Sequence, residues 1–121
     1  MLYPEQIKAF AARFPGKKIV FVPETDASEA IVKIAENSQD SWDVVLALIS
    51  STSLRVHYQA KELWFVVKGT MNLYIKEVGC VRCVPLDSGD SYTINPGISY
   101  WVNNGVGTAE ALVITWSEPA A

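Results

Sequence analysis

The sequence predicts an all-β fold with one short helix at its start. Short runs rich in β-branched and aromatic residues recur along the chain, and turn signals built from Gly, Pro, Asn and Asp separate them at even spacing. Over residues 71–76, apolar and polar residues alternate, which is typical of a half-buried strand. Many short strands at even spacing indicate a sandwich or a barrel.

The first segment predicts a helix over residues 4–14. Pro4 suits the first turn, apolar residues such as Ile7 and Phe10 repeat at helical spacing, and Pro15 with Gly16 ends the pattern. The strands expected after it span residues 19–22, 30–34, 44–50, 53–58, 62–68, 71–76, 80–86, 91–94, 99–103 and 109–116. A short helix within residues 27–40 stays open as an alternative.

The composition predicts one domain over residues 1–121, with residues 1–16 as helix and lead-in. Half of the 121 residues are hydrophobic and 19% are charged, which supports one core. The net charge of −3, without a basic stripe, argues against nucleic acid or an anionic membrane as main partner. The start lacks a signal-peptide pattern, and the longest apolar run, residues 44–49, is too short to cross a bilayer. We therefore expect a cytoplasmic location.

The two cysteines, Cys80 and Cys83, form a Cys-x-x-Cys pair within an expected strand. A zinc ribbon needs a second ligand pair, and the only histidine, His57, is far away in sequence. Residues three apart in a strand point to opposite faces, so we expect two unpaired thiols.

Three polar residues that can support chemistry lie close together in sequence. Arg55 and His57 are two residues apart, so one strand carries both on the same face. Glu62 begins the next expected strand, which Gly69 closes.

A second cluster follows Gly89. After five residues comes the turn Asn95-Pro96-Gly97, and Tyr100 stands three residues past that glycine. Asn104 lies four residues further on.

These two clusters resemble the two sequence motifs of the cupin superfamily. The first motif has His-x-His, a short gap, Glu, six residues and Gly; here Arg55, His57, Glu62 and Gly69 stand at those positions. The second has Gly, five residues, Pro-x-Gly, two residues, His, three residues and Asn, which matches residues 89–104. The resemblance covers residues 53–116 and implies a single-domain cupin-type jelly-roll β-barrel.

Two of the four metal-ligand positions that this resemblance implies have changed. Cupins bind a divalent metal through three His and one Glu, but here Arg55 and Tyr100 stand at two of the His positions. Arginine has no lone pair for a metal, and a phenol near its ordinary pKa is a costly ligand. We expect no cofactor. The alternative is a divalent transition metal held by His57, Glu62 and Tyr100. A different register, which pairs His57 with Gln59, also stays open.

The resemblance leaves three functions open. The first is a metal-free enzyme of isomerase or epimerase type on an anionic or sugar-like ligand, with His57 as base, Tyr100 as acid, Glu62 beside them and Arg55 binding an anion; the metal-free sugar-nucleotide epimerases of the superfamily are the precedent. The second is a metal-dependent dioxygenase or isomerase, and the third is a barrel that binds a ligand without chemistry.

Three structural expectations accompany these functions. The aromatic residues Trp64, Trp101 and Trp116 are candidates to line the ligand site. As a structural alternative, Arg55 and Glu62 form a buried ion pair. The early strands, at 19–22 and 31–34, offer sheet edges, and we expect them to pair in a homodimer.

Overall fold

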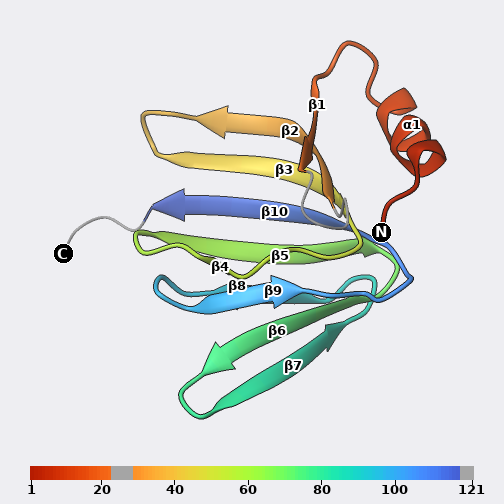
Figure 1. Cartoon of the computed structure of the whole chain (residues 1–121). Coiled ribbons are helices and arrows are strands. Elements are labelled where there is room, and N and C mark those ends of the chain that lie inside the picture. Colours follow the sequence, from red (N-terminus) through yellow and green to blue (C-terminus); the bar gives the residue numbers. More distant parts are fainter. Residues whose placement is uncertain (23–28, 118–121) are drawn as a thin grey trace.

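The computed structural model describes residues 1–22 and 29–117, and it confirms the predicted all-β fold. Within these residues two antiparallel sheets face one another, with one helix beside the larger sheet (Figure 1). The larger sheet has the strand order β1-β2-β3-β10-β5-β8, and the smaller has the order β4-β9-β6-β7. The elements are α1 (Pro4–Ala12), β1 (Ile19–Val22), β2 (Glu29–Asn37), β3 (Trp42–Ile49), β4 (Arg55–Val56), β5 (Ala60–Lys68), β6 (Met71–Glu77), β7 (Cys80–Leu86), β8 (Ser91–Ile94), β9 (Ser99–Val102) and β10 (Ala109–Ser117).

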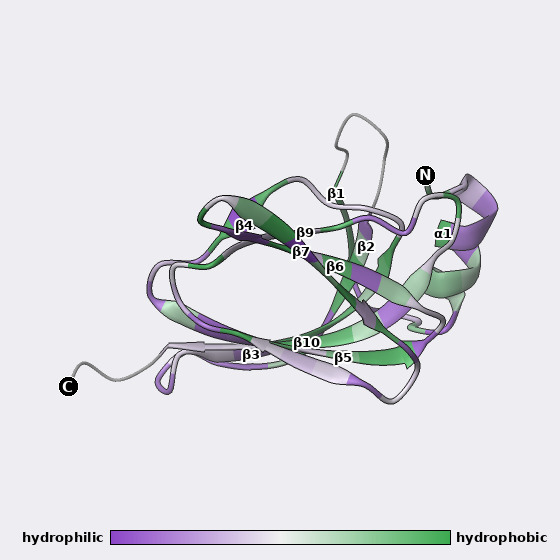
Figure 2. Cartoon of the chain, turned by 90° about the horizontal axis from the view of Figure 1, so that it is seen from below, coloured by the Kyte–Doolittle hydropathy of each residue, from purple (hydrophilic) through white to green (hydrophobic). Residues whose placement is uncertain are grey.

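The main core lies between the two sheets. Figure 2 shows the sheets facing each other, with β3, β5 and β10 opposite β6, β7 and β9. Side chains that alternate along these strands fill the space between them, and the largest fully buried ones are Trp64 and Tyr100. The barrel interior is therefore occupied largely by aromatic and aliphatic side chains.

A second cluster lies on the outer face of the larger sheet, where α1 packs. Phe10 of α1 is 2% exposed and contacts this cluster, in which Val32 of β2 and Leu46 of β3 are also buried. Because neighbouring residues of a strand point to opposite faces, β2 and β3 contribute to both clusters. The predicted helix is confirmed, although it ends at Ala12 rather than residue 14.

Asn104, which matches the last position of the second motif, links strands of the two sheets. Its side-chain oxygen accepts a hydrogen bond from Asn72 N (2.9 Å) at the start of β6, and its amide nitrogen donates to Ile49 O (3.1 Å) at the end of β3. The residue thus holds a turn and also connects the two layers.

The structure corrects two expectations about the elements and agrees with a third. The alternative helix within residues 27–40 is wrong over the described residues, because β2 runs from Glu29 to Asn37 and pairs with both β1 and β3. For the same reason, the expected edge at residues 31–34 is wrong: β2 is an inner strand, and β1 alone of the two is an edge. Cys80 and Cys83 are free and exposed on β7, as expected.

No helix among the described residues is long and apolar enough to cross a membrane.

Candidate functional site

Glu62 lies at the centre of a buried polar group inside the barrel. It belongs to β5, is 5% exposed, and is opposite Thr115 of β10 in the strand ladder. Trp64 Nε1 donates to Glu62 Oε1 (2.6 Å), the Tyr100 hydroxyl donates to the same oxygen, and Thr115 Oγ1 donates to Oε2 (3.2 Å). A carboxylate that accepts this many hydrogen bonds can stay buried.

His57 connects this group to the surface. Its Nε2 atom is 3.3 Å from Glu62 Oε2, while its side chain is 42% exposed. The ring lies beside an open hollow of about 440 Å³ that residues 56–60 line. Among the described residues, Glu62 is the charged partner of the His57 ring, and the rest of the exposed ring is open to a molecule from outside.

Tyr100 is fully buried and holds its proton. Burial, followed by the negative charge and the hydrogen bond of Glu62, raises the pKa of Tyr100 far above its ordinary value. The ring also contacts Trp64 edge-on, with 6.1 Å between ring centroids. The hydroxyl therefore fixes the Glu62 carboxylate in place, and its proton is not available to a ligand.

Arg55 pairs with Glu29 and not with Glu62. The Arg55 guanidinium contacts both carboxylate oxygens of Glu29, a residue of β2 that is 2% exposed. Burial alone would lower the pKa of Arg55, but the hydrogen bonds and charge of Glu29 outweigh it and raise the pKa. The expected Arg55–Glu62 ion pair is thus wrong. Sequence reasoning missed Glu29 because it is 26 residues from Arg55 and belongs to no motif.

The structure supports the alignment in which Arg55 and Tyr100 occupy two histidine positions of the motifs, over the alternative that pairs His57 with Gln59. Arg55 is opposite Tyr100 in the β4–β9 ladder, whereas Gln59 is exposed.

The structure does not bring the tryptophans together. Trp64 lies inside the barrel, but Trp101 stacks on Tyr74, with 5.4 Å between ring centroids, on the outer face of the smaller sheet. Trp101 is therefore not brought to the group around Glu62. Trp116 lies next to Thr115 on β10, so strand alternation directs it to the opposite face from Glu62.

The residues at the four motif positions do not fit a metal ion. Arg55 brings a positive charge and no lone pair, and Tyr100 keeps the proton that it donates to Glu62. Both Glu62 oxygens already accept hydrogen bonds, which leaves His57 as the one nitrogen ligand. The described residues contain no group of three or more His, Cys, Asp and Glu side chains arranged to hold a metal. A stable transition-metal site needs more protein ligands than this arrangement offers.

Comparison with known proteins finds similarity in structure. No family model matches the sequence, and no curated protein matches it. The hydroxypropylphosphonic acid epoxidase from S. wedmorenis matches with a TM-score of 0.70 at 12% identity, over 84% of this chain and 56% of that one, so the chain spans about half of its length. A predicted oxalate decarboxylase from Thermotoga maritima matches with a TM-score of 0.71 at 13% identity, over 85% and 95%. The cupin domain of Schizosaccharomyces pombe Cnp3 matches with a TM-score of 0.66 at 6% identity, over 86% and 71%.

Proposed function

We propose that this chain, which has the cupin fold, binds a small molecule at the mouth of its barrel, where His57 accepts a proton without help from a metal. The observation that carries the proposal is the contact between exposed His57 and buried Glu62, at 3.3 Å. A histidine beside a buried carboxylate at an open hollow is a frequent arrangement for acid–base chemistry.

Glu62 orients the imidazole in this arrangement. A carboxylate next to Nε2 favours a proton on that nitrogen, which leaves a lone pair on Nδ1. The carboxylate also stabilises the imidazolium that forms when Nδ1 takes a proton, as the aspartate does in a catalytic triad. Because Trp64, Tyr100 and Thr115 hold both Glu62 oxygens, the carboxylate cannot turn away from His57.

The roles of the other expected site residues follow from their contacts. Tyr100 and Trp64 act as positioning residues for Glu62. In the proposed reaction His57 is the base, and Tyr100 does not act as the general acid. Arg55 is held by Glu29, so its charge is already paired inside the protein. A reaction of isomerase type would then use His57 alone to remove and return the proton.

Small organic acids are the ligand class that we favour. The similar structures include an epoxidase named for hydroxypropylphosphonic acid and a predicted oxalate decarboxylase, and both names refer to small acids. An Fe(II)-bound HppE is also among them, but the changed residues at positions 55 and 100 speak against an iron-dependent reaction here. The proposal includes the homodimer argued below and the cytoplasmic location that the sequence predicts.

Because His57 is the only histidine, its imidazole gives a unique NMR signal that tests ligand binding. We expect acids such as oxalate and pyruvate, screened at millimolar concentration, to shift this signal when they bind in the hollow. The His57→Gln variant should lose the same ligands while it keeps its fold, since the side chain is partly exposed. Binding that leaves the His57 signal unchanged, and survives this substitution, would contradict the proposed site.

The metal-free part of the proposal is tested by elemental analysis. Protein expressed in metal-supplemented medium should contain well under one transition metal per chain. The triple variant Glu29→Gln/Arg55→His/Tyr100→His restores three histidines beside Glu62 and removes the unpaired Glu29 charge, so we expect it to gain about one nickel per chain. One tightly held metal per wild-type chain would refute the proposal.

A further inference from the structure

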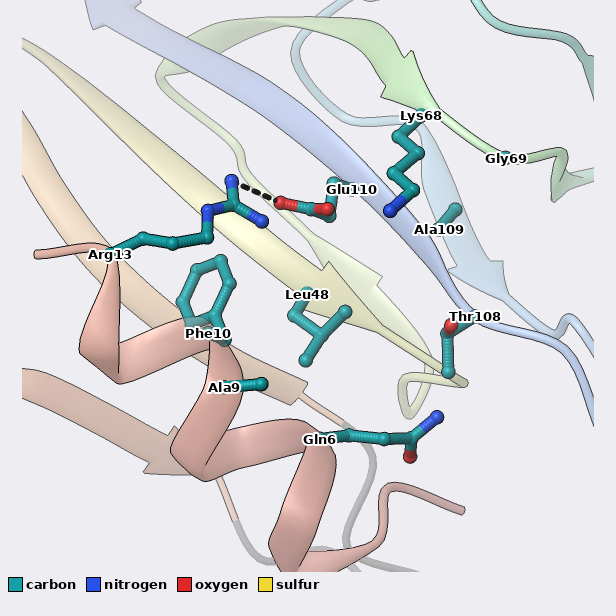
Figure 3. Close-up of a pocket in the computed structure, with 10 residues that line it drawn as sticks. All are labelled: Gln6, Ala9, Phe10, Arg13, Leu48, Lys68, Gly69, Thr108, Ala109 and Glu110. Carbon is teal, nitrogen blue, oxygen red and sulfur yellow. Dashed lines mark ion pairs between the residues drawn. The ribbon is translucent and has the colours of Figure 1, made fainter.

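A cleft of about 400 Å³ lies outside the barrel, between α1 and the outer face of the larger sheet. It is formed by α1 on one side and by β3, the β5–β6 turn and the start of β10 on the other (Figure 3). Glu110, which lines it, is next to Ala111, whose side chain belongs to the barrel core, so Glu110 points away from the barrel interior. The cleft is thus separate from the hollow beside His57, and its size suits a small organic ligand.

Small residues keep the cleft open. Ala9 of α1, Gly69 of the β5–β6 turn and Ala109 of β10 lie along it and add little side-chain volume. Gly69 has φ +82°, and a Cβ atom there would be 2.8 Å from Thr108 O, so a side chain at this position would strain the turn and force the backbone to shift. Phe10 and Leu48 provide the apolar part of the wall.

A buried carboxylate in the cleft has incomplete hydrogen bonding. The Glu110 side chain is 7% exposed, and its Oε1 atom lies 2.7 Å from Arg13 Nη2 in an ion pair. The hydrogen bond and the charge of Glu110 raise the pKa of Arg13, and no second side chain of the described residues bonds to the Glu110 carboxylate. Buried carboxylates normally accept several hydrogen bonds, so Glu110 is suited to accept one from a ligand.

Two cations lie around this carboxylate. The Arg13 guanidinium lies over the rings of Phe10 and Phe14, at 5.6 and 5.4 Å from their centroids, which fixes its position. Lys68 is opposite Glu110 in the β5–β10 ladder and directs its ammonium group toward the cleft (Figure 3). Two positive charges and one negative charge leave an excess of one positive charge, which favours an anionic ligand.

We propose that this cleft binds a small hydroxylated organic anion, with its carboxylate at Lys68 and a hydroxyl group donating to Glu110, which lies between Lys68 and Arg13 (Figure 3). The side chains of Gln6 and Thr108 lie at the other end of the cleft, away from Arg13 and Glu110, and offer further hydrogen bonds to hydroxyl groups (Figure 3). The apolar wall formed by Phe10 and Leu48 accommodates the carbon chain. This site is independent of the one proposed at His57.

The proposal is tested with three small molecules that separate charge from hydroxyl groups. D-gluconate carries both, hexanoate carries the charge only, and sorbitol carries hydroxyl groups only. In amide NMR titrations of the whole chain, gluconate should shift the signals of Lys68, Gly69 and Glu110 in a saturable way. It should bind about tenfold or more tightly than hexanoate and sorbitol, because each of these lacks one set of charge-assisted or hydrogen-bond contacts.

Two lysine variants provide the matched comparison. Lys68→Gln removes the one of the two cleft cations that is not paired with Glu110, and it should weaken gluconate binding about tenfold. Lys76→Gln removes a charge that is likewise exposed, on β6 of the other sheet, and should leave the binding unchanged. Equal gluconate affinity in wild type and Lys68→Gln, no saturable shift at Glu110, or shifts confined to His57 and its neighbours would each overturn the proposal. Hexanoate binding as tightly as gluconate would overturn the role of Glu110.

Discussion

Arg55 and Tyr100 occupy two positions at which the cupin motifs place histidine, and each contacts a buried carboxylate. Arg55 pairs with Glu29, and Tyr100 donates to Glu62. In both cases the side chain that replaces an imidazole supplies a proton donor to a buried acid: Arg55 is the partner of Glu29, and Tyr100 adds to the hydrogen bonds that Trp64 and Thr115 donate to Glu62. Positions 55 and 100, which bind a metal in the cupin motifs, thus have a structural role here. Of the residues at the four motif positions, His57 is the one left for a ligand to contact.

The Arg55–Glu29 pair predicts a strong coupling between two substitutions. Arg55→Met leaves the Glu29 carboxylate buried without its partner, and we expect it to lower the free energy of unfolding by about 3 kcal/mol. The double variant Glu29→Gln/Arg55→Met removes both charges and should recover most of that loss. Urea unfolding of the two single variants and the double variant measures the coupling, and additive effects would contradict it.

Tyr100 predicts a pH dependence in the alkaline range. The pKa of Tyr100 is raised above the unfolded value of about 10, so its contribution to stability is complete below about pH 10. Above that pH the unfolded chain binds fewer protons than the native chain, and the free energy of unfolding falls as pH rises. Native wild type and Tyr100→Phe should show equal tyrosinate absorbance at about pH 11. Extra absorbance in the wild type would mean that Tyr100 ionises in the folded protein.

At the scale of the elements, the sequence predicted strand positions well and long-range partners poorly. The ranges expected for β1, β7 and β8 agree with the structure residue for residue, because turn residues bound each of these apolar runs. The predicted strand at 53–58 is reduced to Arg55–Val56, since only these two residues pair with β9. Glu29 and Glu110 carry no local signal, because their importance arises from contacts with residues distant in sequence.

The β5–β6 turn allows a matched test of close backbone approach. Gly69 and Gly79 have almost the same backbone conformation, with φ +82° and +78°, but a Cβ atom at Gly79 meets nothing within 4 Å. Gly79→Ala should therefore cost only the strain of a left-handed alanine, about 1 kcal/mol. Gly69→Ala should cost at least about 1 kcal/mol more, because its Cβ would be 2.8 Å from Thr108 O. If urea unfolding gave the same decrease in the free energy of unfolding for both variants, the β5–β6 turn would be shown to accommodate the Cβ atom at no extra cost.

At the scale of the whole molecule, one strand connects the two proposed sites. Thr115, near the end of β10, bonds to Glu62 inside the barrel, whereas Glu110, near its start, faces α1 on the outside. Five residues of extended strand separate them by roughly 17 Å. Substitutions in one site should therefore have effects that add to those in the other.

The edge strand β1 predicts a homodimer. Val20 and Phe21 are 47% and 37% exposed on this edge of the larger sheet, and an uncovered apolar edge favours pairing with a second copy about a two-fold axis. Light scattering at micromolar concentration should give the mass of two chains. Val20→Lys places a charge on that edge and should give monomers. Val81→Lys, which places the same charge at a similarly exposed position on the β7 edge of the smaller sheet, should leave the dimer intact. A monomeric wild type would refute the dimer, and dissociation by Val81→Lys alone would move the interface to β7.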